Sequence, residues 1–141
     1  MNVIVDTCVI IDALANREPF AKDAQELCLA VANDEISGFI PAKSVADIYY
    51  IMHKYFHSDT ETRALLKKLF MSFGILDTTA LDCRNALTSP ISDFEDAILT
   101  ETAYRAGVDY IVTRNTKDFA RSTVPVVTAE EMVKMCEDIR A

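Results

Sequence analysis

The chain has 141 residues, of which half are hydrophobic, and it carries a formal net charge of −8 at pH 7. With only 3 glycines and 4 prolines, it is expected to fold as a single domain over residues 1–141 rather than to remain disordered. The acidic balance argues against a general nucleic-acid coat, which would carry a basic stripe, but it is compatible with an enzyme whose carboxylates hold a cation.

The cysteines and the N-terminus predict a reduced, cytoplasmic protein without a membrane segment. The 4 cysteines are far apart and show no CxxC spacing, as expected of small buried thiols in a reducing compartment. The N-terminal run MNVIVDTCVIIDAL lacks a basic region, and Asp6 and Asp12 interrupt its apolar residues. It is therefore neither a signal peptide nor a membrane span.

The first half of the chain predicts two strands and four helices. Apolar runs indicate the strands, and apolar residues at helical spacing indicate the helices. In chain order the expected elements are strand Asn2–Val5, a helix from Thr7 or Cys8, a helix over about 20–33 opened by Pro19, strand 37–40 ended by Pro41, a helix over 43–56, and a helix to about Phe73 that begins at a Ser58–Glu61 capping box.

The second half predicts three more strands, each followed by a helix or a polar loop. Its expected elements are strand 75–77 after a break at Gly74, a helix from Thr79 through Leu87, a helix from a Ser92–Glu95 capping box to Gly107, strand 108–113, the polar loop TRNTKDF, edge strand 124–127, and a C-terminal helix opened by a Thr128–Glu131 capping box. Five strands alternating with helices predict an α/β three-layer sandwich, with a central parallel sheet flanked by helices.

Four acids fall where this layout brings strand ends and helix starts together. Asp6 ends the first strand, Asp47 opens the helix after the second, Asp96 lies in the first turns of its helix, and Asp118 follows the fourth strand. All four are expected at the carboxyl edge of the sheet, where open α/β sheets bind ligands. Four carboxylates in one pocket repel one another without a cation, and oxygen ligands suit Mg²⁺ or Mn²⁺.

Most of these acids also have a structural interpretation. Helix N-termini would be complemented by Asp47, Asp96 and Asp93, and Asp93 is expected at the first helical position. Asp118 would be a turn residue, and Asp12 would be a solvated helix charge. Asp6 differs because it directly follows the apolar run Val3-Ile4-Val5, where a carboxylate is poorly solvated and needs a partner.

Four segments in order resemble the PIN-domain proteins, the fold of the VapC-type toxin ribonucleases: VIVDTCVIID, SVADIYYI, DFEDAILTETA and DYIVTRNTKDF. The resemblance covers nearly the whole chain. It implies a metal-dependent endoribonuclease in which Mg²⁺ or Mn²⁺ is held by Asp6, Asp47, Asp96 and Asp118, with support from Thr7, Thr113 and Asn115. It further implies RNA as substrate, an antitoxin protein as partner, and a homodimer.

The chain departs from the family pattern at Asp47, where a glutamate is usual. The shorter side chain either binds the metal through water or holds no second ion. The implied reaction is attack of a metal-activated water on a phosphodiester, with one carboxylate orienting that water.

Basic residues near the acids are candidate phosphate contacts, because RNA affinity is largely electrostatic. Arg114 and Lys117 are favoured, since they flank Asn115 and Asp118 in one loop. The other candidates, which equally suit solvated helix charges, are Lys43, Lys54, Arg63, Lys67, Lys68 and Arg121.

Other functions fit less well. A response-regulator receiver would use Asp77 but needs a second acid beside Asp6, and a haloacid-dehalogenase phosphatase needs an aspartate where Cys8 stands. His53 and His57 have i, i+4 spacing but lack the glutamate of HExxH, which favours an exposed helix end. The remaining alternative, supported by Asp47, is a PIN-like module without catalysis that binds RNA or protein. Apolar positions among Tyr49, Tyr50, Met52 and Phe56 suit either a dimer contact or the core.

Overall fold

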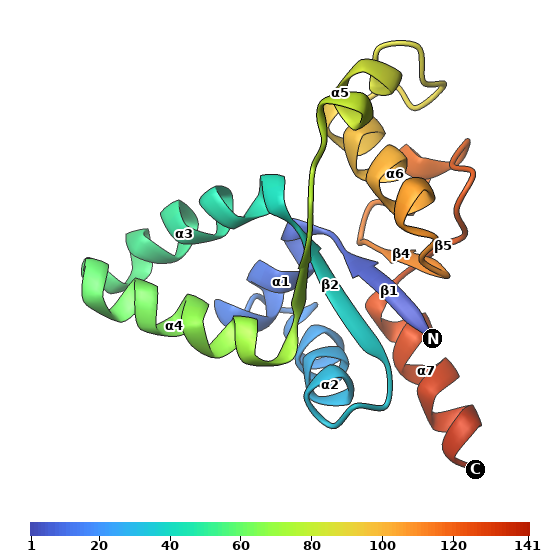
Figure 1. Cartoon of the computed structure of the whole chain (residues 1–141). Helices are drawn as coiled ribbons and strands as arrows, with labels where there is room; N and C mark the ends of the chain where they lie inside the picture. Colours follow the sequence, from blue (N-terminus) through green and yellow to red (C-terminus); the bar gives the residue numbers. More distant parts are fainter.

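A five-stranded, all-parallel sheet runs through the centre of the protein (Figure 1). The computed structural model describes residues 1–141. In the spatial order β3-β2-β1-β4-β5, the strands are β3 Gly74–Leu76, β2 Ser37–Pro41, β1 Asn2–Val5, β4 Tyr110–Val112 and β5 Val126–Val127. The predicted strand 124–127 shortens to Val126–Val127 but lies at an edge of the sheet, as its proline indicated.

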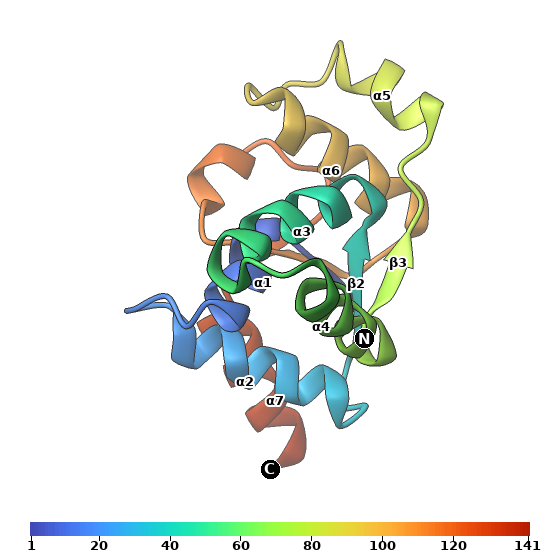
Figure 2. The same cartoon turned by 90° about the vertical axis from the view of Figure 1, so that its left-hand side faces the viewer.

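Helices cover both faces of this sheet, which confirms the predicted α/β architecture (Figures 1 and 2). One face carries α1 Thr7–Leu14, α2 Ala21–Ala32, α3 Ala42–Phe56, α4 Asp59–Ser72 and α7 Ala129–Arg140, and the other carries α6 Phe94–Ala106 with α5 Ala80–Ala86 packed on it. A short 3₁₀ helix, η1 Thr116–Phe119, follows β4. None of the helices has the length and hydrophobicity required to cross a bilayer.

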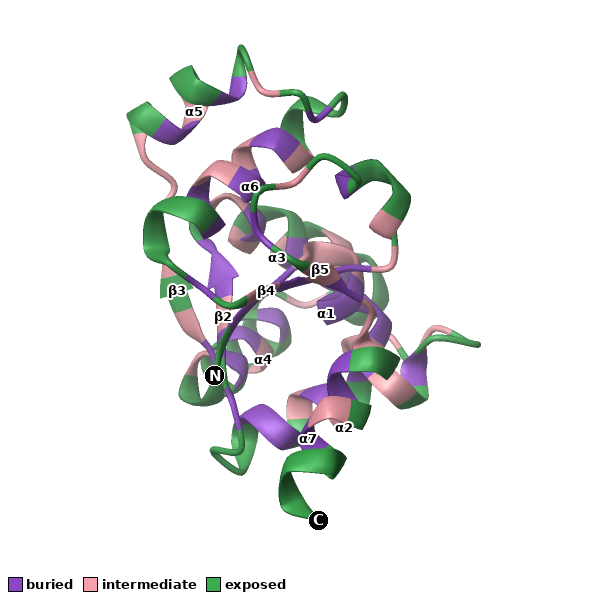
Figure 3. Ribbon diagram, turned by 90° about the vertical axis from the view of Figure 1, so that its right-hand side faces the viewer, coloured by how far each residue is buried: buried purple, intermediate pink, exposed green.

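The pleat of the central strand divides the core into two clusters. Successive side chains of a strand point to opposite faces, so Val3 and Val5 pack in the larger cluster under α1, α2, α3, α4 and α7. Ile4 points the other way and packs against Leu99 and Ile111 in the cluster under α6. All three β1 residues are fully buried, and Figure 3 shows this burial in the strands and the inner helix faces. Asp6, which follows them directly, is therefore held on a rigid support.

Helix caps differ from the prediction at one functional position. Asp93, expected as the first helical residue, is instead the N-cap of α6, and its Oδ1 accepts a hydrogen bond from the amide of Asp96 at 2.9 Å. The predicted Ser92–Glu95 capping box is therefore wrong, because aspartate at 93 is itself an effective cap. Gly107 ends α6 as predicted, with a left-handed φ of 68°.

Capping elsewhere largely follows the prediction. The Thr128–Glu131 box forms at α7, and Thr79 caps α5 in a box with Asp82. Ser58 accepts a hydrogen bond from the Glu61 amide, but the carboxylate of Glu61 makes no return bond, so this predicted box is only half formed.

Several boundaries also move. Gly74 is the first residue of β3 rather than a break before it, and a Cβ there would lie 2.7 Å from Cδ1 of Phe39 in the neighbouring strand. Pro19 precedes α2 by two residues instead of opening it. The predicted strand 108–113 shortens to β4, and part of the expected TRNTKDF loop winds into η1. This last change places Asp118 in a defined turn.

Candidate active site

An acidic cleft of about 470 Å³ lies at the carboxyl edge of the sheet, lined by residues of α1, α3, η1 and the start of α6. The structure places the four predicted acids, from four separate segments, in its lining, together with the predicted supporting residues Thr7 and Asn115. The full lining is Asp6, Thr7, Cys8, Ile11, Arg17, Asp47, Tyr50, Ile51, Lys54, Asp93, Glu95, Asp96, Asn115 and Asp118.

Sheet register determines the position of Asp6. Val5 pairs with Val112 in the parallel ladder, so the residues that follow them, Asp6 and Thr113, lie side by side. Asp6 Oδ2 accepts a hydrogen bond from Thr113 Oγ1 at 2.9 Å, and Asp6 Oδ1 accepts one from the Thr7 amide at 2.8 Å. Both carboxylate oxygens are thus oriented, and Asp6 also serves as the N-cap of α1.

Asp96, at the start of α6, has a strongly raised pKa. Burial raises its pKa to about 7, and the nearby carboxylates of Asp6, Asp93 and Asp118 add to that rise, while Lys43 opposes it. The charges of these acids therefore act on one another through space. A cation bound among them would relieve this repulsion.

The loop after β4 brings two further side chains with oxygen atoms, Asn115 and Asp118, to the cleft. The Asn115 amide donates to Thr113 Oγ1 at 3.1 Å, and the Asp118 amide donates to the Asn115 carbonyl at 2.9 Å. Asn115 and Asp118 are both exposed. These bonds shape the loop so that one threonine hydroxyl connects Asp6 with the segment that carries Asn115 and Asp118.

Three further residues, Tyr50, Lys54 and Arg17, line the cleft. Lys54 was among the other candidate phosphate contacts, whereas Tyr50 and Arg17 were not assigned to the site. Tyr50 and Lys54 follow Asp47 at three and seven residues along α3, and Arg17 comes from the loop between α1 and α2. Helical spacing from Asp47 was a usable signal for the first two, because such residues share one helix face. Nothing in the local sequence pointed to Arg17.

The two favoured basic residues lie outside this lining. Lys117 is exposed on η1. Arg114 turns to Asp12, with its Nε 2.8 Å from Asp12 Oδ2. Asp12, predicted to be a solvated helix charge, is only 1% exposed; that prediction was wrong because the helix packs this side inward. Burial raises the pKa of Asp12, and Arg114 and Arg17 offset part of that effect.

The remaining α3 predictions divide between core and surface. Met52 is buried in the main cluster, whereas Tyr50 and Phe56 are exposed. Half-buried His53 stacks on the ring of Tyr49 with 5.8 Å between centroids, and exposed His57 ends the helix. The histidines therefore lie at a helix end, as expected.

The donor chemistry of the cleft fits a hard divalent cation, although no preformed ligand cluster is present. No three His, Cys, Asp or Glu side chains converge closely enough to hold an ion. Carboxylate and amide oxygens are nevertheless the ligands that Mg²⁺ and Mn²⁺ prefer, and Mg²⁺ usually retains several waters that bridge to carboxylates. The lining offers such oxygens on Asp6, Asp96, Asn115 and Asp118.

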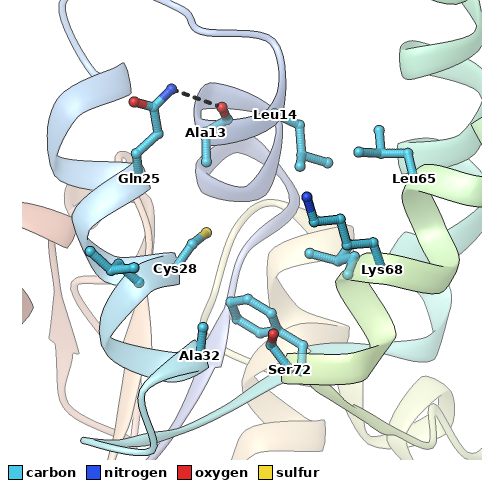
Figure 4. Close-up of a pocket in the computed structure, with 11 residues that line it drawn as sticks. Ala13, Leu14, Gln25, Cys28, Ala32, Leu65, Lys68 and Ser72 are labelled. Atoms are coloured by element: carbon cyan, nitrogen blue, oxygen red, sulfur yellow. Dashed lines mark hydrogen bonds between the residues drawn. The ribbon is translucent and has the colours of Figure 1, made fainter.

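A second hollow, an apolar groove of about 360 Å³, lies between α1, α2 and α4 (Figure 4). Its lining is mostly hydrophobic and includes Leu14, Leu29, Leu65 and Phe73. It shares no lining residue with the acidic cleft. The acidic cleft and this groove are therefore chemically distinct surfaces.

The parallel sheet and its acidic edge define an α/β domain with a candidate catalytic cleft. The chain belongs to the PIN-domain family, whose model matches residues 2–117. Among solved structures it is similar to a toxin–antitoxin complex from Klebsiella pneumoniae, with 25% identity and a TM-score of 0.66 over 90% of this chain and 97% of that chain.

Two further structures show the same fold. VapBC-1 from nontypeable Haemophilus influenzae is 17% identical, with a TM-score of 0.64 over 92% of this chain and 98% of that chain. FitAcB from Neisseria gonorrhoeae is 16% identical, with a TM-score of 0.65 over 90% and 97%. A comparison with curated protein sequences found no match.

Proposed function

We propose that this PIN domain, spanning residues 1–141, is a Mg²⁺- or Mn²⁺-dependent endoribonuclease and the toxin of a toxin–antitoxin pair. The observation that carries the proposal is the meeting of Asp6, Asp47, Asp96 and Asp118 in one cleft, which is acidic enough to help raise the pKa of Asp96 to about 7. Perturbed carboxylates gathered in a cleft are typical of functional sites.

Each acid has a distinct role in this proposal. Asp6, held by Thr7 and Thr113, would bind the cation with Asp96 and Asp118, and the shorter Asp47 would reach it through water. When bound, such a cation supplies a nucleophilic water at neutral pH and offsets charge on the phosphate. One of the carboxylates of the cleft would orient that water.

Three other residues of the cleft suit a single RNA strand. Arg17 and Lys54 provide positive charge for phosphates. Tyr50 is 66% exposed, and exposed aromatic rings stack unpaired bases. We assign these three residues to substrate binding in place of Arg114, while Lys117 remains a peripheral candidate.

Cleavage and melting experiments test this function together. The native protein should cut single-stranded RNA in Mg²⁺ or Mn²⁺ but not in chelator, and Asp6→Asn should abolish cleavage. Asparagine is as good a helix cap as aspartate, so this variant should still fold. An Asp138→Asn variant, changed at an exposed α7 carboxylate, should cleave like the native protein.

Thermal melts separate the nuclease from the alternative. A cation that binds only the folded form stabilises it by about 2.7 kcal/mol at a hundredfold excess over its dissociation constant, which raises the melting temperature by several degrees. Mn²⁺ should raise the melting temperature of the native protein but not that of Asp6→Asn. No response in the native protein would favour the second candidate, a catalytically weak PIN-like module, to which the Asp47 departure points.

The apolar groove is the surface we assign to the antitoxin partner. The Klebsiella pneumoniae structure is a toxin–antitoxin complex, and a partner segment with apolar side chains would cover Leu29, which is 60% exposed in the groove. Leu29→Glu should abolish co-purification with a co-expressed antitoxin while leaving RNA cleavage intact. Leu87→Glu, at the exposed residue that follows the remote helix α5, should have no effect on either.

Two further expectations complete the proposal. Exposed Tyr55 and Phe56 on α3 are candidate contacts for a homodimer, which sedimentation analysis would detect. The 4 cysteines are all free thiols, which supports the expected cytoplasmic setting.

A further inference from the structure

Adjacent side chains in the loop after β4 contact different parts of the protein. The hydroxyl of Thr113 contacts Asp6, and Asn115 lines the acidic cleft. Arg114, between them, is not part of the cleft lining and instead contacts Asp12 and Phe20.

Arg114 is anchored by these two contacts outside the cleft lining. Its Nε lies 2.8 Å from Oδ2 of Asp12 in α1, and its guanidinium carbon lies 4.3 Å from the ring centroid of Phe20, just before α2. Planar stacking on an aromatic face combined with an ion pair is a geometry that arginine makes and lysine does not. The Arg114 side chain is 32% exposed and that of Asp12 only 1%, so the pair is shielded from bulk water on the carboxylate side.

The carboxylate of Asp12 depends on this contact. Its second oxygen, Oδ1, is buried and has no hydrogen-bond partner, and a buried charge that loses its partner is strongly destabilising. Arg114 Nε also has no hydrogen-bond partner, so the contact that joins the loop after β4 to α1 is an ion pair rather than a hydrogen bond.

We propose that Arg114 is a positioning residue that clamps the loop carrying Asn115 and Asp118 onto α1, with Asp12 as its anchor. The loop is then attached at two points of one N-terminal segment, through Thr113 to Asp6 and through Arg114 to Asp12. Asn115 and Asp118 follow these attachments directly, so their placement over the cleft depends on them. The inference rests on the proposed function insofar as the loop delivers metal ligands.

A double-mutant cycle tests the clamp through metal affinity. The variants are Arg114→Gln, Asp12→Asn and the two combined, with Mn²⁺ binding measured by calorimetry at fixed pH. Groups that orient metal ligands typically contribute about 10-fold to 100-fold in affinity. Each single variant should weaken Mn²⁺ binding by about tenfold or more. The double variant should be little worse than either single one, because both remove the same contact.

Other roles for Arg114 give different results. A phosphate-binding Arg114 would raise the KM for RNA in Arg114→Gln, leave Mn²⁺ affinity unchanged, and leave Asp12→Asn harmless. A purely structural pair would lower the melting temperature in both single variants without changing Mn²⁺ affinity. Either pattern overturns the proposal. Arg84→Gln, at an exposed position on α5, is the charge-matched control and should change none of these quantities.

Hydrogen exchange tests the clamp without metal. In chelator, the amides of Asn115 and Asp118, bonded to Thr113 Oγ1 and the Asn115 carbonyl, should exchange faster in Arg114→Gln and Asp12→Asn than in the native protein. Arg114→Lys keeps the charge but loses the stacking, and should give an intermediate rate. Unchanged protection would overturn the clamp. If the native protein binds no Mn²⁺ but the exchange rates rise, the metal proposal fails and the clamp stands.

Discussion

Thr113 and Asp6, 107 residues apart in the chain, are joined by a 2.9 Å hydrogen bond from Oγ1 to Oδ2. The same hydroxyl oxygen accepts a hydrogen bond from the backbone amide of Asn115. Thr113 is fully buried, so its orientation is fixed by packing at the end of β4. A single side chain therefore links the acid after β1 to the loop after β4.

Replacing Thr113 tests that link. Thr113→Val keeps the shape of the side chain but removes both hydrogen bonds, and we expect Mn²⁺ affinity to fall by about tenfold. Thr113→Ser keeps the hydroxyl and should retain most of the affinity. Calorimetric titration of both variants would check this, and equal affinities for Val and Ser would show that the hydroxyl does not orient Asp6 for metal.

The pKa of Asp96 predicts how the metal-free protein responds to pH. An aspartate in the unfolded chain titrates at about 3.9, whereas burial and neighbouring acids raise the folded-state pKa of Asp96 to about 7. Between these values the folded form binds a proton that the unfolded form does not, so its stability rises as pH falls from about 8 to about 5.5. Denaturant unfolding in chelator should show this gain, and Asp96→Asn should lose it.

Metal binding should show the opposite pH dependence. A proton on Asp96 competes with the cation for the same carboxylate, so Mn²⁺ affinity should weaken as pH falls below about 7. Titrations at several pH values would measure this. An affinity that is flat from about pH 8 to about pH 6 would mean that Asp96 is not a ligand.

Asp47→Glu should keep or raise metal-dependent cleavage. Asp47 is exposed and lines the cleft from the second turn of α3, so the longer side chain has room to reach the other acids. Cleavage of single-stranded RNA across a Mg²⁺ and Mn²⁺ series would measure the effect, with Asp47→Asn as the charge-removing control. Loss of all activity in the glutamate variant, while the native protein cleaves, would show that the shorter acid is an adaptation.

Lys54→Ala should raise the KM for RNA several-fold, with little change in kcat. Lys54 lies on the same helix face as Asp47 and lines the cleft, and removing one phosphate contact should also reduce the salt slope by about one. Initial rates at two salt concentrations would check both effects. Lys134→Ala, on the exposed side of α7, changes the net charge equally and should leave the KM unchanged.

The sequence by itself determined the parallel α/β fold and most of its elements. Apolar runs such as Val3-Ile4-Val5 and the Thr128–Glu131 capping box are local signals, and local signals survive in the folded chain. The assignment of Asp6, Asp47, Asp96 and Asp118 to one edge also followed from sequence, because every parallel strand ends on the same side of its sheet. Their presence in a single cleft agrees with that topology.

Only the tertiary structure decided which polar side chains line the cleft and which pair with buried groups elsewhere. Arg114 and Asn115 are adjacent in sequence, yet Arg114 pairs with buried Asp12 while Asn115 lines the cleft. Arg17 reaches the cleft from a loop that no motif marked. These outcomes depend on how α1 and α2 pack beside the loop after β4, and that packing joins residues about 100 positions apart. Local propensity carries no information about such distant contacts, so the direction of each of these side chains is determined by the assembled fold.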